Sequence, residues 1–154
     1  GAEALEFNLR LFEKARAVKF IKKYLYHYMH NAESITTKHD EKNQEFVIKC
    51  FEKIKNEIDN NDAEIMFWFY NRMKYVILTT AISGYFSDSN PEVYSVQKRK
   101  FKKYLENNLV QETLKQKDNL GLSLTRKVTL FLIKHKMFLC VKLISKIRGI
   151  QKNK

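Results

Sequence analysis

One stretch of sequence, residues 65–84, limits the fold more than any other feature of the chain. It reads IMFWFYNRMKYVILTTAISG and is apolar on nearly every side of a helix, which is typical of a helix surrounded by other elements. Pro occurs once and Gly four times in 154 residues, too few for the frequent tight turns of a many-stranded β fold. We therefore predict one helical core around a central helix at about 62–84.

Periodic apolar residues and capping signals predict the remaining elements. Helices are expected at about 3–16, 40–58, 91–107 and 109–117, followed by one long final helix at about 123–148. Rings alternate with other side chains over Tyr24–His30, so a strand is predicted there, within a hairpin at 18–30. The predicted fold class is mainly α: a bundle of about five helices with a short β-hairpin or strand near the N-terminus.

Two local features refine these expectations. On the helix at 40–58, Lys53 and Glu57 stand four residues apart and are expected to form an ion pair. In the loop SDSNPE, Pro91 is expected at the first helical position of the helix at 91–107.

The charge of the chain is concentrated at its C-terminal end. The net charge is +12, from 29 basic and 17 acidic side chains, and no acidic residue follows Asp118. Such a one-sided segment is expected to attract an anionic surface or partner. The basic residues predicted to face it are Arg126, Lys127, Lys134, Lys136, Lys142, Lys146 and Arg148.

Two interpretations of the final helix stay open from the sequence. A broad apolar face with only Lys and Arg as charges suits an anionic membrane interface. The alternative is a core helix with a solvated basic face. Nucleic-acid binding is the third use of such charge, and KRKFKKY at 98–104 interleaves basic and aromatic residues, but no helix-turn-helix or RNA-binding motif accompanies it.

The chain carries little catalytic or metal-binding equipment of its own. It lacks a Gly-rich phosphate loop, a G-x-S-x-G motif and an Asp-x-Asp pair, and no metal site is predicted. Cys50 and Cys140 lie on apolar helix patterns and are expected to be buried, reduced thiols, as in a cytoplasmic protein. The longest uncharged stretch, Tyr75–Ser87, is shorter than the roughly 20 residues of a membrane span.

A family resemblance covers about the first quarter of the chain. Residues 2–37, AEALEFNLRLFEKARAVKFIKKYLYHYMHNAESITT, resemble the end of the catalytic domain of bacterial family 2 glycosyltransferases, which have the GT-A fold. The residues that carry the resemblance are Glu3, Phe7, Asn8, Leu9, Leu11, Lys19, Phe20, Ile21, Leu25, Tyr26, Tyr28, Asn31, Ser34, Ile35 and Thr36.

The resemblance implies a division of the chain and two site residues. Residues 1–37 would be the last helix and hairpin of the catalytic domain, and 38–154 a C-terminal helical extension. The family's general base is the Asp of a Glu-Asp pair, and Ala4 stands in its place here, which leaves Glu3 as the catalytic candidate. His30 is nearest to a residue that helps hold the donor diphosphate or its metal.

The resemblance also implies function and partners. The parent enzyme would transfer a sugar from a nucleotide-sugar donor to a cell-surface polysaccharide or lipid-linked acceptor, with Mg or Mn in its missing domain. The fragment itself is expected to hold no cofactor and to be inactive. Its helices would serve membrane docking, acceptor positioning or oligomerisation, in the cytoplasm at the inner membrane face. The alternative is a stand-alone basic helical module that binds an acidic partner or nucleic acid. An unpaired strand edge would also let two copies form a dimer.

Overall fold

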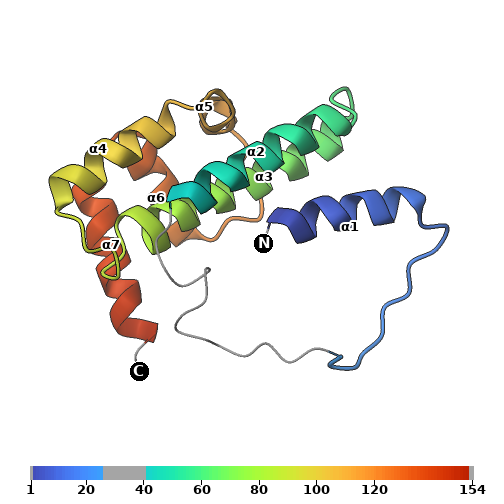
Figure 1. Ribbon diagram of the computed structural model, residues 1–154, viewed down its shortest axis with the longest axis horizontal. Helices are drawn as coiled ribbons and strands as arrows, with labels where there is room; N and C mark the ends of the chain where they lie inside the picture. The colour runs from blue at the N-terminus through green and yellow to red at the C-terminus, as the bar shows by residue number, and fades with distance from the viewer. Residues whose placement is uncertain (1, 26–40, 153–154) are drawn as a thin grey trace.

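The computed structural model describes residues 2–25 and 41–152, and these residues are mainly helical (Figure 1). They contain seven α-helices and one π-helical segment, which confirms the mainly α class but exceeds the predicted number of about five helices. The elements are α1 (Ala2–Lys14), α2 (Glu41–Glu57), α3 (Ala63–Thr79), η1 (Thr80–Tyr85), α4 (Tyr94–Leu105), α5 (Asn108–Lys115), α6 (Leu124–Lys134) and α7 (Phe138–Lys152).

The predicted central helix is confirmed as α3 and its continuation η1. It begins at Asp62, whose carboxylate accepts hydrogen bonds from the backbone N–H groups of Glu64 and Ile65 at 2.8 and 3.0 Å. It ends with a wider turn, in which the N–H of Phe86 donates to the carbonyl of Ala81 at 2.9 Å. Helices α4, α5, α6 and α7 pack around this rod, so it occupies the centre of the core.

Aromatic rings join the end of this rod to α4 and α7. Phe86, Phe101 and Phe138 are almost completely buried. The ring centroid of Phe86 lies 5.2 Å from that of Phe101 and 5.9 Å from that of Phe138. Edge-to-face and offset contacts of this kind add to the stability gained from apolar burial. This cluster therefore fixes α7 against the rest of the bundle.

The predicted single final helix at 123–148 is wrong, because the chain turns between α6 and α7. Lys136 adopts φ 58°, the left-handed conformation that ends a helix. Ile133 and Phe138 are both buried at 1% exposure or less. On one continuous helix these two side chains would point about 140° apart. The turn lets both enter the same core.

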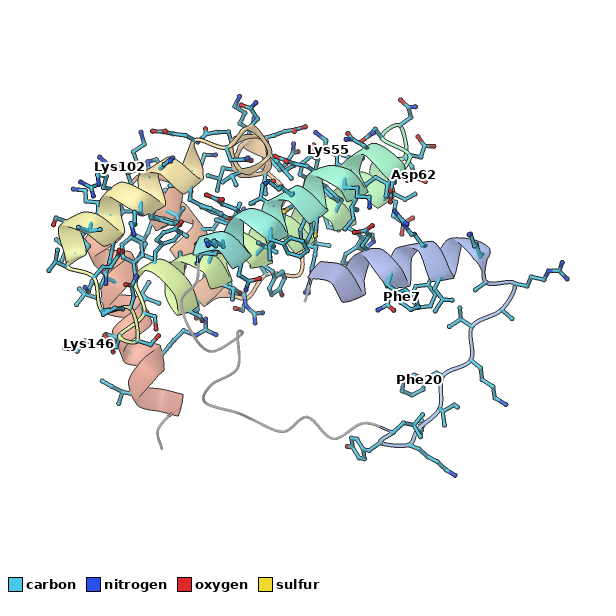
Figure 2. All side chains as sticks on the ribbon, in the orientation of Figure 1. Phe7, Phe20, Lys55, Asp62, Lys102 and Lys146 are labelled. Atoms are coloured by element: carbon cyan, nitrogen blue, oxygen red, sulfur yellow. The ribbon has the colours of Figure 1, made fainter. Side chains whose placement is uncertain are left out.

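Residues 18–25, the described part of the predicted hairpin at 18–30, contain no strand, and most of the predicted strand at Tyr24–His30 lies outside the described residues. In 18–25 the apolar side chains are exposed, with Phe20 at 84% and Tyr24 at 99% (Figure 2). A strand without a partner leaves its backbone N–H and C=O groups unpaired. No described element offers that partner here, which accounts for the irregular conformation.

Two smaller expectations are also corrected. Pro91 precedes the helix, because α4 begins at Tyr94 after Val93. The side chain of Asn90 instead organises the loop, since it donates to the carbonyl of Tyr85 at 2.9 Å and accepts from the N–H of Glu92 at 3.0 Å.

The expected pair within α2 is replaced by two ion pairs to α1. Lys53 binds the carboxylate of Glu6 at 2.6 Å, and Glu57 binds the guanidinium of Arg10 at 2.9 Å. Glu6 and Arg10 are themselves paired at 3.0 Å. Charged side chains thus connect the N-terminal helix to the bundle, and Phe7 on the same helix is 67% exposed (Figure 2).

Candidate functional site: the outer face of α6 and α7

The outer face of α7 carries a continuous row of exposed apolar side chains. Leu139, Leu143, Ile147 and Ile150 follow one another at helical spacing and are 56–62% exposed. A surface helix normally presents polar residues to water. The other side of α7 packs in the core through Phe138 and Val141. We call these four exposed residues the α7 row.

Helix α6 repeats this arrangement. Leu124, Val128 and Phe131 are exposed at helical spacing, while Leu130 and Ile133 are buried. Met137 in the turn between the helices is also exposed. The imidazole of His135 packs on the ring of Phe131, with centroids 4.2 Å apart. Both helices of the predicted basic segment thus place apolar side chains on the surface.

Most of the predicted basic residues stand beside these rows. Their side chains reach the surface, and Figure 2 shows Lys146 on the outer side of α7. The exposed basic residues of the set are Lys127, Lys134, Lys136, Lys146 and Arg148.

The remaining two basic residues of the set point inward. Arg126 donates to the hydroxyl of Tyr75 at 3.0 Å, and its guanidinium carbon lies 4.7 Å from the centre of that ring. Lys142 donates to the amide oxygen of Gln97 at 3.0 Å and lies over the ring of Tyr94 at 5.3 Å. Burial raises the pKa of the Tyr94 hydroxyl, so this ring stays neutral beside the ammonium group.

A cavity of about 640 Å³ opens between α3, η1, the start of α6 and the second half of α7. Arg126 and Arg148 line it together with Ser123, Thr125 and Thr129. The cavity was not foreseen from the sequence. The only local signal of the cavity was the closeness of Ser123, Thr125 and Thr129 to Arg126 in the sequence. The other lining residues lie far away in the chain.

A buried ammonium group lies where α3 meets the segment before α6. Lys74 is 1% exposed and donates to the backbone carbonyl of Asp118. Burial lowers the pKa of Lys74, and the Asp118 carboxylate offsets that effect only in part. Lys134 on α6 lowers it further. The group lies outside the cavity lining, and its geometry indicates a structural role.

The two candidates that came from the family resemblance stay predictions. Glu3 lies in the first turn of α1, and His30 lies outside the described residues. Cys50 is buried as predicted, whereas Cys140 is only partly buried. Within 2–25 and 41–152, no three His, Cys, Asp or Glu side chains gather as metal ligands. No helix in those ranges has the length and apolar character to cross a membrane.

The basic and aromatic run at 98–104 divides between surface and core. Phe101 is completely buried, and Lys100 pairs with the carboxylate of Glu92. Lys98, Lys102 and Lys103 remain exposed on α4. A buried ring is not available to stack on a nucleic-acid base, so Phe101 does not contribute to such a pattern.

Comparison with known proteins adds no relative to this description: neither a family model, nor a curated protein, nor a solved structure matches the chain.

Proposed function

We propose that α6 and α7 dock the protein on an anionic membrane surface. The observation that carries this proposal is the α7 row, exposed to solvent beside Lys146 in a segment without acidic residues after Asp118. Apolar side chains of an interfacial helix enter the boundary between headgroups and acyl chains, and neighbouring Lys and Arg side chains are attracted to anionic headgroups. The location that follows is peripheral, at the cytoplasmic face of a membrane.

The test measures binding to vesicles of phosphatidylcholine with and without phosphatidylglycerol. We expect binding only to the anionic vesicles, and weaker binding as salt rises from about 0.1 to about 1 M, because the Debye length falls from about 10 to about 3 Å. Deleting the segment from Ser123 onward is unsuitable as a test, since Ile133 and Phe138 belong to the core.

Surface substitutions test the charge contribution without disturbing the fold. Neutralising Lys127, Lys134 and Lys146 to Gln should weaken binding about 100-fold, since each basic residue near an anionic surface contributes about 1 kcal/mol. The matched control neutralises Lys98, Lys102 and Lys103 on α4, of which Figure 2 labels Lys102, apart from Lys146. Equal weakening by both triple variants would refute docking through α6 and α7.

We further propose that this docking module belongs to a family 2 glycosyltransferase, in which it holds the enzyme at a membrane-bound acceptor. Two observations support this proposal. Residues 3–36 resemble the end of that family's catalytic domain, and apolar side chains of the same region are exposed. Phe7 and Leu11 on α1 are 67% and 52% exposed, and Phe20 in the following segment is 84% exposed. Such side chains are expected where a preceding catalytic sheet would cover them.

The glycosyltransferase proposal is tested on the gene and on the longer product. The coding DNA upstream of Ala2 should encode alternating β-strands and α-helices with an Asp-x-Asp pair, which would bind the nucleotide diphosphate through Mg or Mn. The full product should transfer sugar from a nucleotide-sugar donor, and these 154 residues alone should not. A start codon directly before Ala2 would refute this proposal and leave the docking proposal intact.

A further inference from the structure

The cavity between η1, α6 and α7 has a polar side suited to an anion. Arg126 and Arg148 line it from different helices, and the guanidinium group of Arg126 also donates to the hydroxyl of Tyr75, another lining residue. Arg148 makes no hydrogen bond or ion pair with any other residue that the structure describes. No Asp or Glu belongs to the lining, although Asp88 lies beside Gly149, with Oδ2 3.4 Å from where a Cβ would stand. Planar guanidinium groups bind phosphate through paired hydrogen bonds.

Ser123 and Thr125 bring the start of α6, with its backbone donors, to the cavity lining. Ser123 is the residue before the first turn of the helix, and its hydroxyl accepts no capping hydrogen bond from it. The first N–H groups of a helix have no acceptor within the helix and favour an anion. Thr125 lines the cavity next to them, whereas the hydroxyl of Thr129 is already committed to the carbonyl of Thr125 at 2.8 Å.

Part of the cavity lining is apolar. Leu78, Ile82 and Ile144 belong to it, and the hydroxyl of Ser145 holds α7 against η1 by donating to the carbonyl of Ile82 at 2.6 Å. Ile147 lines the cavity and also belongs to the exposed α7 row. One apolar surface therefore leads from the cavity to the face proposed to contact the membrane.

We propose that this cavity binds the phosphate monoester headgroup of a lipid, with the phosphate at Arg126, Arg148 and the start of α6. The first part of the acyl chain lies along Ile144 and Ile147 and continues over the α7 row. The volume of about 640 Å³ is within the range of small-molecule sites. This inference rests on the proposed membrane docking and adds selectivity for one headgroup to it.

The test is calorimetric titration of the whole chain with soluble short-chain lipids. Dihexanoyl phosphatidic acid, below the concentration at which it aggregates, should bind once per chain. Dihexanoyl phosphatidylcholine and inorganic phosphate should each bind at least about 10-fold more weakly, because one lacks the net charge and the other the apolar chain. Arg148→Gln should weaken phosphatidic acid binding about 10-fold, and Lys102→Gln on α4 should leave it unchanged.

Three results would overturn the inference. The first is that inorganic phosphate binds as tightly as phosphatidic acid. The second is that Arg148→Gln binds phosphatidic acid as tightly as the parent does. The third is that phosphatidic acid does not bind. The vesicle experiment separates this inference from the docking proposal. Docking on phosphatidylglycerol vesicles that is as tight as docking on phosphatidic acid vesicles would refute the cavity inference alone. Selective binding of the soluble phosphatidic acid without docking on any vesicle would refute the docking proposal alone.

Discussion

Replacing one side chain of the α7 row tests whether its apolar surface, and not only its charge, binds the membrane. Leu143 is 56% exposed, so about half of its side chain is already buried in the free protein. Complete burial of a Leu side chain is worth about 1.5–3 kcal/mol, which leaves about 1–1.5 kcal/mol to be gained on entering the lipid. Leu143→Gln should therefore weaken binding to anionic vesicles about 5–10-fold.

The same argument extends to several residues of the row. Changing Leu139, Leu143 and Ile147 together to Gln should remove about 3–4.5 kcal/mol, which is more than 100-fold in vesicle affinity. Gln retains the helix propensity of Leu, and the three positions are exposed. The midpoint of urea unfolding should therefore change little. Co-sedimentation with vesicles, at several lipid concentrations and constant salt, measures the affinity.

Leu11 on α1 provides the matched control for Leu143. It is a Leu of similar exposure, 52%, on a helix that Figure 1 places at the other end of the molecule from α7. Leu11→Gln should leave vesicle binding unchanged. If Leu143→Gln binds vesicles as tightly as the parent, or if Leu11→Gln weakens binding as much, the α7 row does not enter the lipid.

Three further predictions concern stability. Phe101→Ala should lower the free energy of unfolding by about 3–5 kcal/mol in urea titration, because a fully buried ring is lost, whereas Phe131→Ala, 57% exposed, should cost about 0.5 kcal/mol or less; equal costs would contradict the core described here. Partial burial favours the neutral form of Glu112, but hydrogen bonds from Lys55 and Tyr70, each 2.5 Å, outweigh it and lower the pKa of Glu112. The unfolded chain then binds more protons at acid pH, so stability should fall as pH drops below about 4.5, and less steeply in Glu112→Gln. The lowered pKa of buried Lys74 contributes stability that increases as pH rises toward 10.5, whereas the raised pKa values of Tyr70 and Tyr104 lower stability near and above pH 10. The stability of the parent relative to that of Lys74→Met should therefore increase with pH toward 10.5 in thermal unfolding.

The central helix could be predicted because its signal is local and redundant. Residues 65–84 are apolar on nearly every side, and Asp62 stands directly before them, so both the burial of the helix and its start follow from neighbouring residues. The break at Lys136 could not be predicted in this way. A left-handed turn is usually marked by Gly or Asn, and here a Lys adopts it because Ile133 and Phe138 share one core.

The basic surface was predictable as a group but not residue by residue. The absence of acidic residues after Asp118 identifies the segment. The direction of each side chain depends on distant partners: Arg126 binds Tyr75, which is 51 positions away, and Lys142 binds Gln97, which is 45 positions away. The cavity escaped prediction for the same reason, since its walls come from α3, η1, α6 and α7.

The π-helical segment η1 has a consequence for how this chain can change during evolution. A π turn contains one residue more than an α turn, so removing one residue from Thr80–Tyr85 would convert it to an ordinary α turn and leave the flanking helix in register. Within α3, which has no residue in excess, a one-residue deletion would instead turn everything after it by about 100°. Phe86 would then leave the ring cluster. Related sequences that differ in length along this helix are therefore expected to gain or lose the residue within Thr80–Tyr85.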